Sequence, residues 1–108
     1  MLYHSTDNVG ITIINPTKSQ MRALIGRLDE PEINISEYQD IILTNHTCGW
    51  SISLFPSGIA VLEGLEKEDK NPATLSSVSR NEAFKMWLDL SIGATDAILA
   101  HDWKTQKH

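Results

Sequence analysis

Apolar positions in the first thirty residues change from a β-branched run to a helical repeat. Residues 9–14 (VGITII) are rich in β-branched side chains, which predicts a strand. Pro16 ends it, because proline has no backbone N–H for the ladder. Thr17 and Gln20 have the spacing of a capping box. Four apolar residues then recur at helical spacing: Met21, Leu24, Ile25 and Leu28. We therefore expect an amphipathic helix over residues 17–29.

The middle of the chain has the patterns of extended structure. Residues 40–44 are apolar enough for a central strand, and residues 50–54 (WSISL) alternate between large apolar residues and serine. The turn-forming residues 56–58 (PSG) then predict a hairpin with a return strand over residues 59–65. Residues 75–78 are expected to form a short edge strand.

The last third of the chain is predicted to be helical. Ser79 and Glu82 form a second possible capping box, and apolar residues at helical spacing follow up to Gly93, which suits a helix end. A shorter helix is expected over residues 95–101, adding Ile98 and Leu99 to the core. We expect residues 104–108 to be frayed.

This order of elements predicts an α+β fold. We expect an antiparallel β-meander of about four to five strands, with an N-terminal helix and two C-terminal helices on it. With 108 residues, 41% of them hydrophobic and 21% charged, the chain is expected to form one domain over residues 1–108 with its own core.

Cysteine content and the N-terminal sequence predict the compartment. The single Cys48 has no internal disulfide partner, which suits a reducing environment. Residues 1–7 (MLYHSTD) lack the basic and apolar regions of a secretory signal, and no apolar run is long enough to span a bilayer. We expect a cytoplasmic, soluble protein.

Charge is the most informative feature that remains. No lysine or arginine occurs between Arg27 and Lys67, although the chain has a net charge of only -5. That interval contains seven carboxylates: Asp29, Glu30, Glu32, Glu37, Asp40, Glu63 and Glu66. Gathered on one surface, they would attract a basic partner and repel nucleic acid and anionic membranes. The alternative is a solvated acidic loop that keeps the protein soluble.

No catalytic or metal-binding motif accompanies these carboxylates. His46 and Cys48 are close enough in sequence for a thiol and its base, but the negative surroundings disfavour the thiolate. The four histidines lack pairwise metal spacing, and the glycines occur singly rather than in a phosphate-binding loop. We expect no metal, no cofactor and no enzymatic activity.

The three tryptophans are expected to serve structure first. Trp50 begins the alternating strand and Trp87 lies in the apolar stripe of the long helix, so both are predicted core residues. Trp103 follows the last helix. It is expected either to hold the C-terminal segment onto the domain or to stand in an interface.

Three stretches together carry a resemblance to a known family. They are residues 15–29 (NPTKSQMRALIGRLD), residues 49–54 (GWSISL) with Gly58 and Glu63, and residues 79–90 (SRNEAFKMWLDL) with Gly93 and Trp103. The chain resembles the small α+β immunity proteins encoded beside bacterial polymorphic and contact-dependent toxins. In that family a Pro-Thr helix precedes an antiparallel sheet, and a capped helix with a tryptophan closes the domain.

The resemblance implies a protein that binds one cognate toxin domain and blocks its active site or substrate surface. We expect this toxin to be basic, and a nuclease in the first instance. The acidic interval supplies the candidate toxin-binding residues: Glu30, Glu32, Glu37, Tyr38, Asp40, Glu63 and Glu66. Tyr38 would be the aromatic anchor. Two alternatives remain: a small enzyme or ligand-binding domain with a pocket near His46 and Cys48, and a self-associating structural domain.

Overall fold

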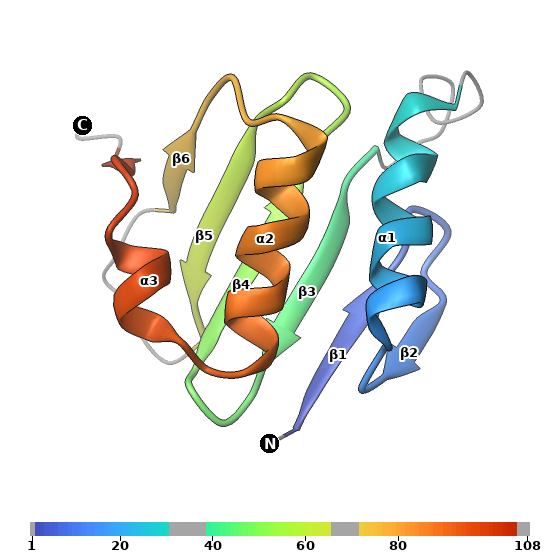
Figure 1. Ribbon diagram of the computed structural model, residues 1–108, viewed down its shortest axis with the longest axis horizontal. Helices are drawn as coiled ribbons and strands as arrows, with labels where there is room; N and C mark the ends of the chain where they lie inside the picture. The colour runs from blue at the N-terminus through green and yellow to red at the C-terminus, as the bar shows by residue number, and fades with distance from the viewer. Residues whose placement is uncertain (1, 31–38, 66–71, 106–108) are drawn as a thin grey trace.

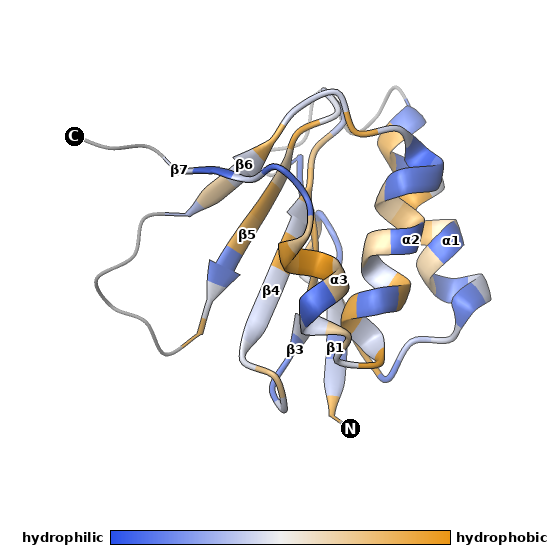
Figure 2. Ribbon diagram, turned by 60° about the vertical axis from the view of Figure 1, so that its left-hand side comes forward, coloured by the Kyte–Doolittle hydropathy of each residue, from blue (hydrophilic) through white to orange (hydrophobic). Residues whose placement is uncertain are grey.

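Seven antiparallel strands form one sheet, and the helices pack on one of its faces (Figures 1 and 2). The computed structural model describes residues 2–30, 39–65 and 72–105, and this count refers to them. The strand order is β2-β1-β3-β4-β5-β6-β7. The strands are β1 (Tyr3–Thr6), β2 (Thr12–Ile14), β3 (Ile41–Asn45), β4 (Trp50–Leu54), β5 (Ala60–Gly64), β6 (Ala73–Leu75) and β7 (Lys104–Thr105). The helices are α1 (Lys18–Gly26), the 3-10 helix η1 (Arg27–Asp29), α2 (Arg80–Ser91) and α3 (Thr95–Leu99).

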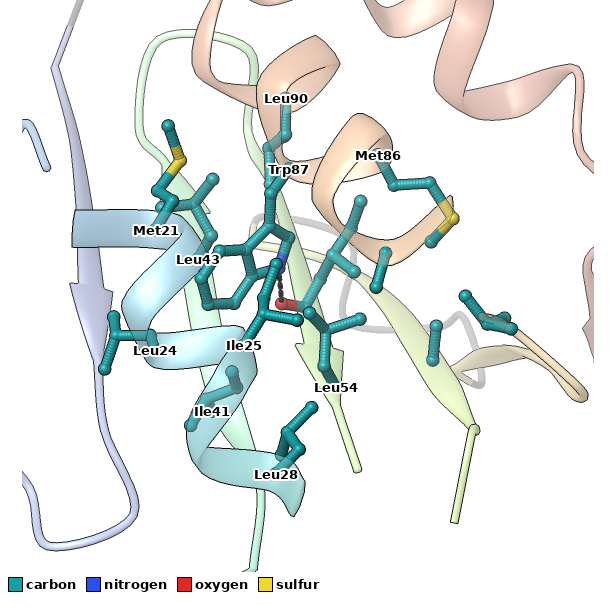
Figure 3. Packing of buried hydrophobic residues seen from close by; sticks show 14 of the residues in the cluster. Met21, Leu24, Ile25, Leu28, Ile41, Leu43, Leu54, Met86, Trp87 and Leu90 are labelled. Atoms are coloured by element: carbon teal, nitrogen blue, oxygen red, sulfur yellow. Dashed lines mark hydrogen bonds between the residues drawn. The ribbon is translucent and has the colours of Figure 1, made fainter. Parts of the chain in front are cut away.

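The hydrophobic core lies between the helices and one face of the sheet (Figure 3). Alternation along β3 and β4 places every second side chain, such as Leu43 and Ile52, beneath the helices, where both are fully buried. Trp87 of α2 is fully buried too, and its indole Nε1 donates a hydrogen bond to the carbonyl of Ile52 at 3.2 Å. Trp50 packs against this core while remaining half-buried. The core role predicted for Trp87 is confirmed, whereas Trp50 lies at the margin of the core.

Both long helices begin at the predicted capping boxes. The Thr17 hydroxyl accepts from the Gln20 N–H at 3.1 Å, and the Gln20 side chain accepts from the Thr17 N–H at 2.9 Å. Ser79 and Glu82 make the same reciprocal pair at the start of α2. These contacts satisfy N–H groups that a helix start leaves without partners. The α-helical part of the first helix ends at Gly26, and η1 continues it to residue 29.

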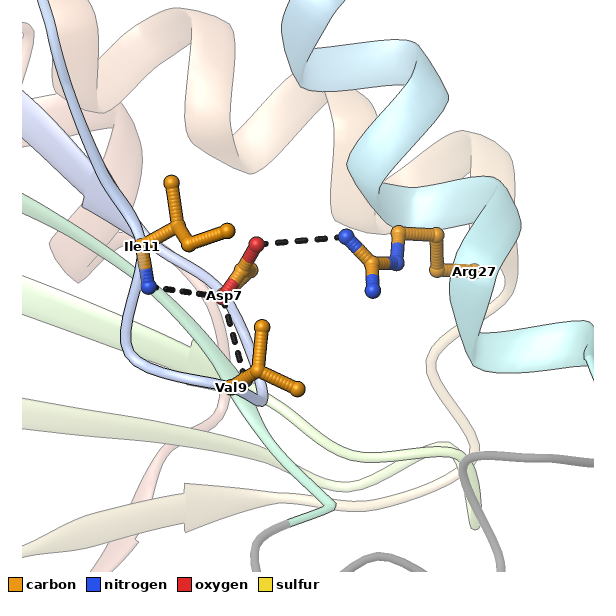
Figure 4. A network of polar contacts seen from close by, with 4 residues as sticks. All are labelled: Asp7, Val9, Ile11 and Arg27. Carbon is orange, nitrogen blue, oxygen red and sulfur yellow. Dashed lines mark hydrogen bonds and ion pairs between the residues drawn. The ribbon is translucent and has the colours of Figure 1, made fainter.

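The N-terminal segment contains two strands, whereas the sequence predicted one. Only residues 12–14 of the predicted strand are extended, and β1 precedes them. The hairpin between them is closed by Asp7, whose Oδ1 accepts from the N–H groups of Val9 at 3.0 Å and Ile11 at 2.9 Å (Figure 4). Asp7 Oδ2 also pairs with Arg27 of η1 at 3.2 Å. These hydrogen bonds to the Asp7 carboxylate hold residues 7–11 in a hairpin loop, although β-branched residues such as Val9 and Ile11 favour strands.

The C-terminal segment also differs from the prediction. β6 covers residues 73–75, not 75–78, and β7 pairs with its outer side, so β6 is not an edge strand. Residues 104 and 105 are thus paired in the sheet rather than frayed, while residues 106–108 lie outside the described part. Trp103 makes this possible: its indole Nε1 donates to the Ile98 carbonyl at 2.8 Å. α3 is shorter than predicted, and Leu99 is exposed instead of joining the core.

Candidate functional site

The face of the sheet that points away from the helices forms a platform of mainly short side chains. Twelve residues in two rows of direct cross-strand neighbours make up what we call the open face. The first row is Thr12, Thr6, Ile42, Ser53, Val61, Thr74 and Lys104; the second is Ile14, His4, Thr44, Ser51 and Glu63. No helix of the described chain covers them (Figure 2). Thr44, Ser51 and Ser53 at its centre are nevertheless buried, so the exposed part of the open face lies toward its margins, at Thr12, Ile14, Glu63 and Lys104.

The structure places three of the seven candidate toxin-binding residues. Glu30 is exposed directly after η1, and Asp40 is half-buried directly before β3. The C-terminal end of the first helix and the start of β3 lie at the same end of the molecule (Figure 1). Glu63 is exposed on the open face of β5. Four further candidates lie outside the described residues: Glu32, Glu37, Tyr38 and Glu66.

Glu63 is separated from the other two placed candidates. It pairs with Ser51 near the start of β4, whereas Asp40 precedes Ile41, which pairs with Leu54 at the end of β4. At about 3.4 Å per residue along the strands and 4.8 Å between them, the backbones of the two residues are roughly 17 Å apart. The described part of the acidic interval therefore provides an acidic end, defined by Glu30 and Asp40, and a separate charge at Glu63.

Asp40 borders a hollow that the sequence did not reveal. The hollow, with a volume of about 360 Å³, is lined by six residues: Thr6, Asp7, Asn8, Gly10, Asp40 and Ile42. It lies where the β1–β2 hairpin meets the start of β3, so its residues come from two distant parts of the sequence. The Asp7 side chain is only 6% exposed and is paired with Arg27. Asp40 therefore carries the exposed acidic charge of this hollow.

One carboxylate of the acidic interval has an internal partner. Asp29 Oδ1 forms an ion pair with Arg80 of α2 at 3.0 Å, and Arg80 also donates to the Pro56 carbonyl at 2.9 Å. The absence of lysine and arginine from the interval therefore does not leave Asp29 without a cationic partner. The reason is that the chain brings a distant arginine to the end of η1, which spacing along the sequence cannot show.

His46 and Cys48 make their contacts on different sides of the turn after β3. Cys48 packs against the core, and its Sγ lies 3.8 Å from the Asn45 carbonyl as a weak donor. The exposed His46 instead lies beside His4: its Nε2 is 3.0 Å from Nδ1 of His4. Burial, and secondly the charge of His46, lower the pKa of His4 below its usual value. The two hollows of this molecule that we describe are lined by neither His46 nor Cys48.

The second hollow lies between the N-terminal end of α1 and the C-terminal end of α2. Its volume is about 320 Å³, and its walls include Tyr3, Lys18, Asp89 and the exposed Ile92. The Tyr3 hydroxyl donates to the Pro16 carbonyl at 3.2 Å, which fixes one wall. The opposite charges of Lys18 and Asp89 give this hollow no preference for a basic or an acidic partner.

No protein family model, curated protein or solved structure matches this chain. Within residues 2–30, 39–65 and 72–105, no helix is both long and apolar enough to cross a membrane. In the same residues, histidine, cysteine and carboxylate side chains do not gather in any group of three suited to a metal ion. The acidic end and the open face are thus the features of the described residues that bear on function.

Proposed function

We propose that this protein is a cytoplasmic, non-enzymatic immunity protein that binds and neutralises a basic bacterial toxin domain, with a nuclease as the expected toxin. The observation that carries the proposal is the acidic end, where exposed Glu30 directly follows η1 and half-buried Asp40 directly precedes β3. The sequence between them adds Glu32 and Glu37 and contains no lysine or arginine.

The nearest arginines do not cancel this charge. Arg27 of η1 is paired with Asp7, and Arg80 is paired with Asp29. Each pair is neutral as a unit, so Glu30 and Asp40 remain as net negative charge beside them. Carboxylates placed in this way resemble the phosphates that a nuclease cleft binds. They would speed the encounter with a basic toxin and occupy its substrate surface.

The open face supplies a second requirement of a protein interface. Thr6 and Ile42 belong both to this face and to the hollow beside Asp40, so the acidic end and the sheet platform are continuous. Charge at one end would steer association, while the flatter surface provides contact area. Protein interfaces commonly combine a polar rim with a less charged centre.

The test compares two variants with equal changes in net charge. In the first, Glu30, Glu32 and Glu37 become glutamine and Asp40 becomes asparagine. In the control, exposed Asp96 and Asp102, on α3 and after it, become lysine. Both variants gain four positive units. Association rates with the toxin domain encoded beside the gene are measured across ionic strengths. The first variant should associate at least tenfold more slowly at low salt, and the difference should shrink at high salt as charges are screened.

Equal rates for the two variants, with melting curves like that of the parent protein, would exclude the acidic end from the interface. A loss of binding that does not change with salt, accompanied by a lower melting temperature, would show misfolding instead. A third variant, Glu63→Gln, tests whether the separate charge on β5 also contributes.

Self-association is a second candidate function, favoured by the β1–β2 hairpin. Val9, Ile11 and Ile14 are exposed there, and β2 is an edge strand. An apolar edge strand can pair with a second copy of the chain. Molar mass in solution tests this: a dimer that Ile14→Lys converts to monomers would support it, and a monomer at all concentrations would remove it.

A further inference from the structure

Two histidines that are far apart in sequence come together on the open face. His4 and His46 are separated by 42 residues, yet Nδ1 of His4 lies 3.0 Å from Nε2 of His46. The strand register explains this contact. His4 pairs with Thr44, and residues two apart on a strand share a face, so His46 is the diagonal neighbour of His4.

The surrounding backbone fixes the turn that carries His46. Its N–H donates to the Leu2 carbonyl at 3.0 Å, which extends the pairing of β1 and β3 by one step. Asn45 is buried and accepts from the Thr47 N–H at 2.8 Å and the Cys48 N–H at 3.2 Å. Its amide also donates to the Leu90 carbonyl of α2 at 2.7 Å. The backbone that carries His46 is therefore fixed beside β1.

The separation of the two nitrogens fits a single metal ion between them. Bonds from imidazole nitrogen to zinc are about 2.0–2.1 Å long. With such bonds, nitrogens 3.0 Å apart subtend an angle of about 94° at the metal. This angle suits a square-planar or octahedral site, and a small increase in the separation reaches tetrahedral geometry.

We propose that His4 and His46 form a two-ligand site for a borderline divalent transition-metal ion such as Zn²⁺. Water or a group from a bound partner completes the coordination, because the described residues supply no third histidine, cysteine or carboxylate to such a group. Glu63, on the same face, lies two strands away from Thr44, or about 10 Å. The site is thus open toward solvent, as exchangeable sites are.

The protonation of the pair is compatible with this ligand. In the metal-free state, one of the facing nitrogens donates a proton to the other. Metal binding moves that proton to the second nitrogen of the same ring, so both rings stay neutral and each presents a lone pair. Neutral imidazole is the form that binds metals.

The experiment is a Zn²⁺ titration of the full chain without affinity-tag histidines, followed by calorimetry and by NMR of the histidine ring nitrogens. One ion should bind per chain, and the ring signals of His4 and His46 should move together. His4→Gln and His46→Gln should each lower the affinity at least tenfold. The double variant should bind Zn²⁺ no more weakly than the single variant with the lower affinity, because the loss of either histidine already breaks the chelate.

Control variants separate this site from other nitrogen ligands. His101→Gln and His108→Gln should leave the affinity unchanged; His101 lies beside Trp103, and His108 is outside the described residues. Binding that survives His46→Gln would assign the metal to other groups, such as the terminal amine with His4, and would overturn the proposal. Absence of binding at millimolar Zn²⁺ would overturn it as well.

The test of the metal site does not depend on whether every variant folds. Ring signals recorded on the unmodified chain identify the ligands directly, so perturbation of rings other than His4 and His46 would refute the site even if a variant failed to fold. The inference stands apart from the immunity function, because it requires no toxin and uses neither Glu30 nor Asp40.

Discussion

The two faces of the sheet differ in the side chains that they present and in what covers them. On β3, Ile41 and Leu43 point toward the helices and are fully buried, whereas Ile42 and Thr44 belong to the open face. The covered face is built from large apolar side chains, and its shape is specified by packing against α1 and α2. The open face carries mainly short side chains, and Thr44, Ser51 and Ser53 at its centre are buried although no described helix lies over them. One face therefore determines the fold, and the other exposes side chains mainly at its margins, such as Thr12 and Glu63.

The largest expected effect on folding belongs to the covered face. Trp87→Ala should lower the free energy of unfolding by about 3 to 5 kcal/mol, because it removes a fully buried indole and leaves a cavity. It also leaves the Ile52 carbonyl without its side-chain donor. Urea denaturation measures the change. A loss below about 1 kcal/mol would mean that α2 turns another side toward the sheet.

Asn45 tests how much a buried polar side chain contributes to stability in comparison with the packing of apolar side chains. Asn45→Ala should cost about 1 to 3 kcal/mol, because the Leu90 carbonyl and the N–H groups of residues 47 and 48 lose their partner. Thr44→Ala, its neighbour on the open face, is the control and should cost less. Equal losses of stability in the two variants would mean that the two faces of β3 do not differ in their contribution to folding.

The prediction for Cys48 concerns function more than stability. Cys48→Ser should leave toxin protection intact and change the free energy of unfolding by less than about 1 kcal/mol, since a hydroxyl can also donate to the Asn45 carbonyl. Growth protection and denaturation are measured together. Loss of protection at unchanged stability would favour the alternative of an enzyme or ligand-binding site near His46 and Cys48.

The smallest effect is expected at the exposed margin of the open face. Thr12→Val should change stability by no more than about 0.5 kcal/mol, because Thr12 is exposed on β2 and valine suits a strand. A large loss, measured by the same denaturation assay, would show that another layer covers this face in solution.

The fold was predictable where a pattern spans several residues. The alternation in residues 50–54 and the two capping boxes identified β4, α1 and α2. β1 was missed because Tyr3 and Ser5 face the helices, and a buried serine leaves no hydrophobic signal. β7 has only two residues, and its position depends on the anchor made by Trp103. Short strands of this kind are specified by tertiary contacts rather than by local sequence.

The candidate site was only partly predictable. The sequence identified Glu30 and Asp40, but it could not show that Glu63 lies elsewhere or that Arg80 neutralises Asp29. The pair of His4 and His46 carried no signal in its spacing, because only the register of β1 against β3 brings them together. Charge composition can be counted along a chain, whereas pairing of charges and ligands requires the fold.

The pairing of β7 with β6 has a consequence for synthesis on the ribosome. β6 emerges well before its outer neighbour, because 30 residues separate Thr74 from Lys104. At roughly 5–20 residues per second, this interval lasts about 2 to 6 seconds. During that time the N–H and C=O groups on the outer side of β6 have no strand beside them. Until β7 is in place, β6 is therefore a second edge strand besides β2, and a transient pairing site for two incompletely folded chains.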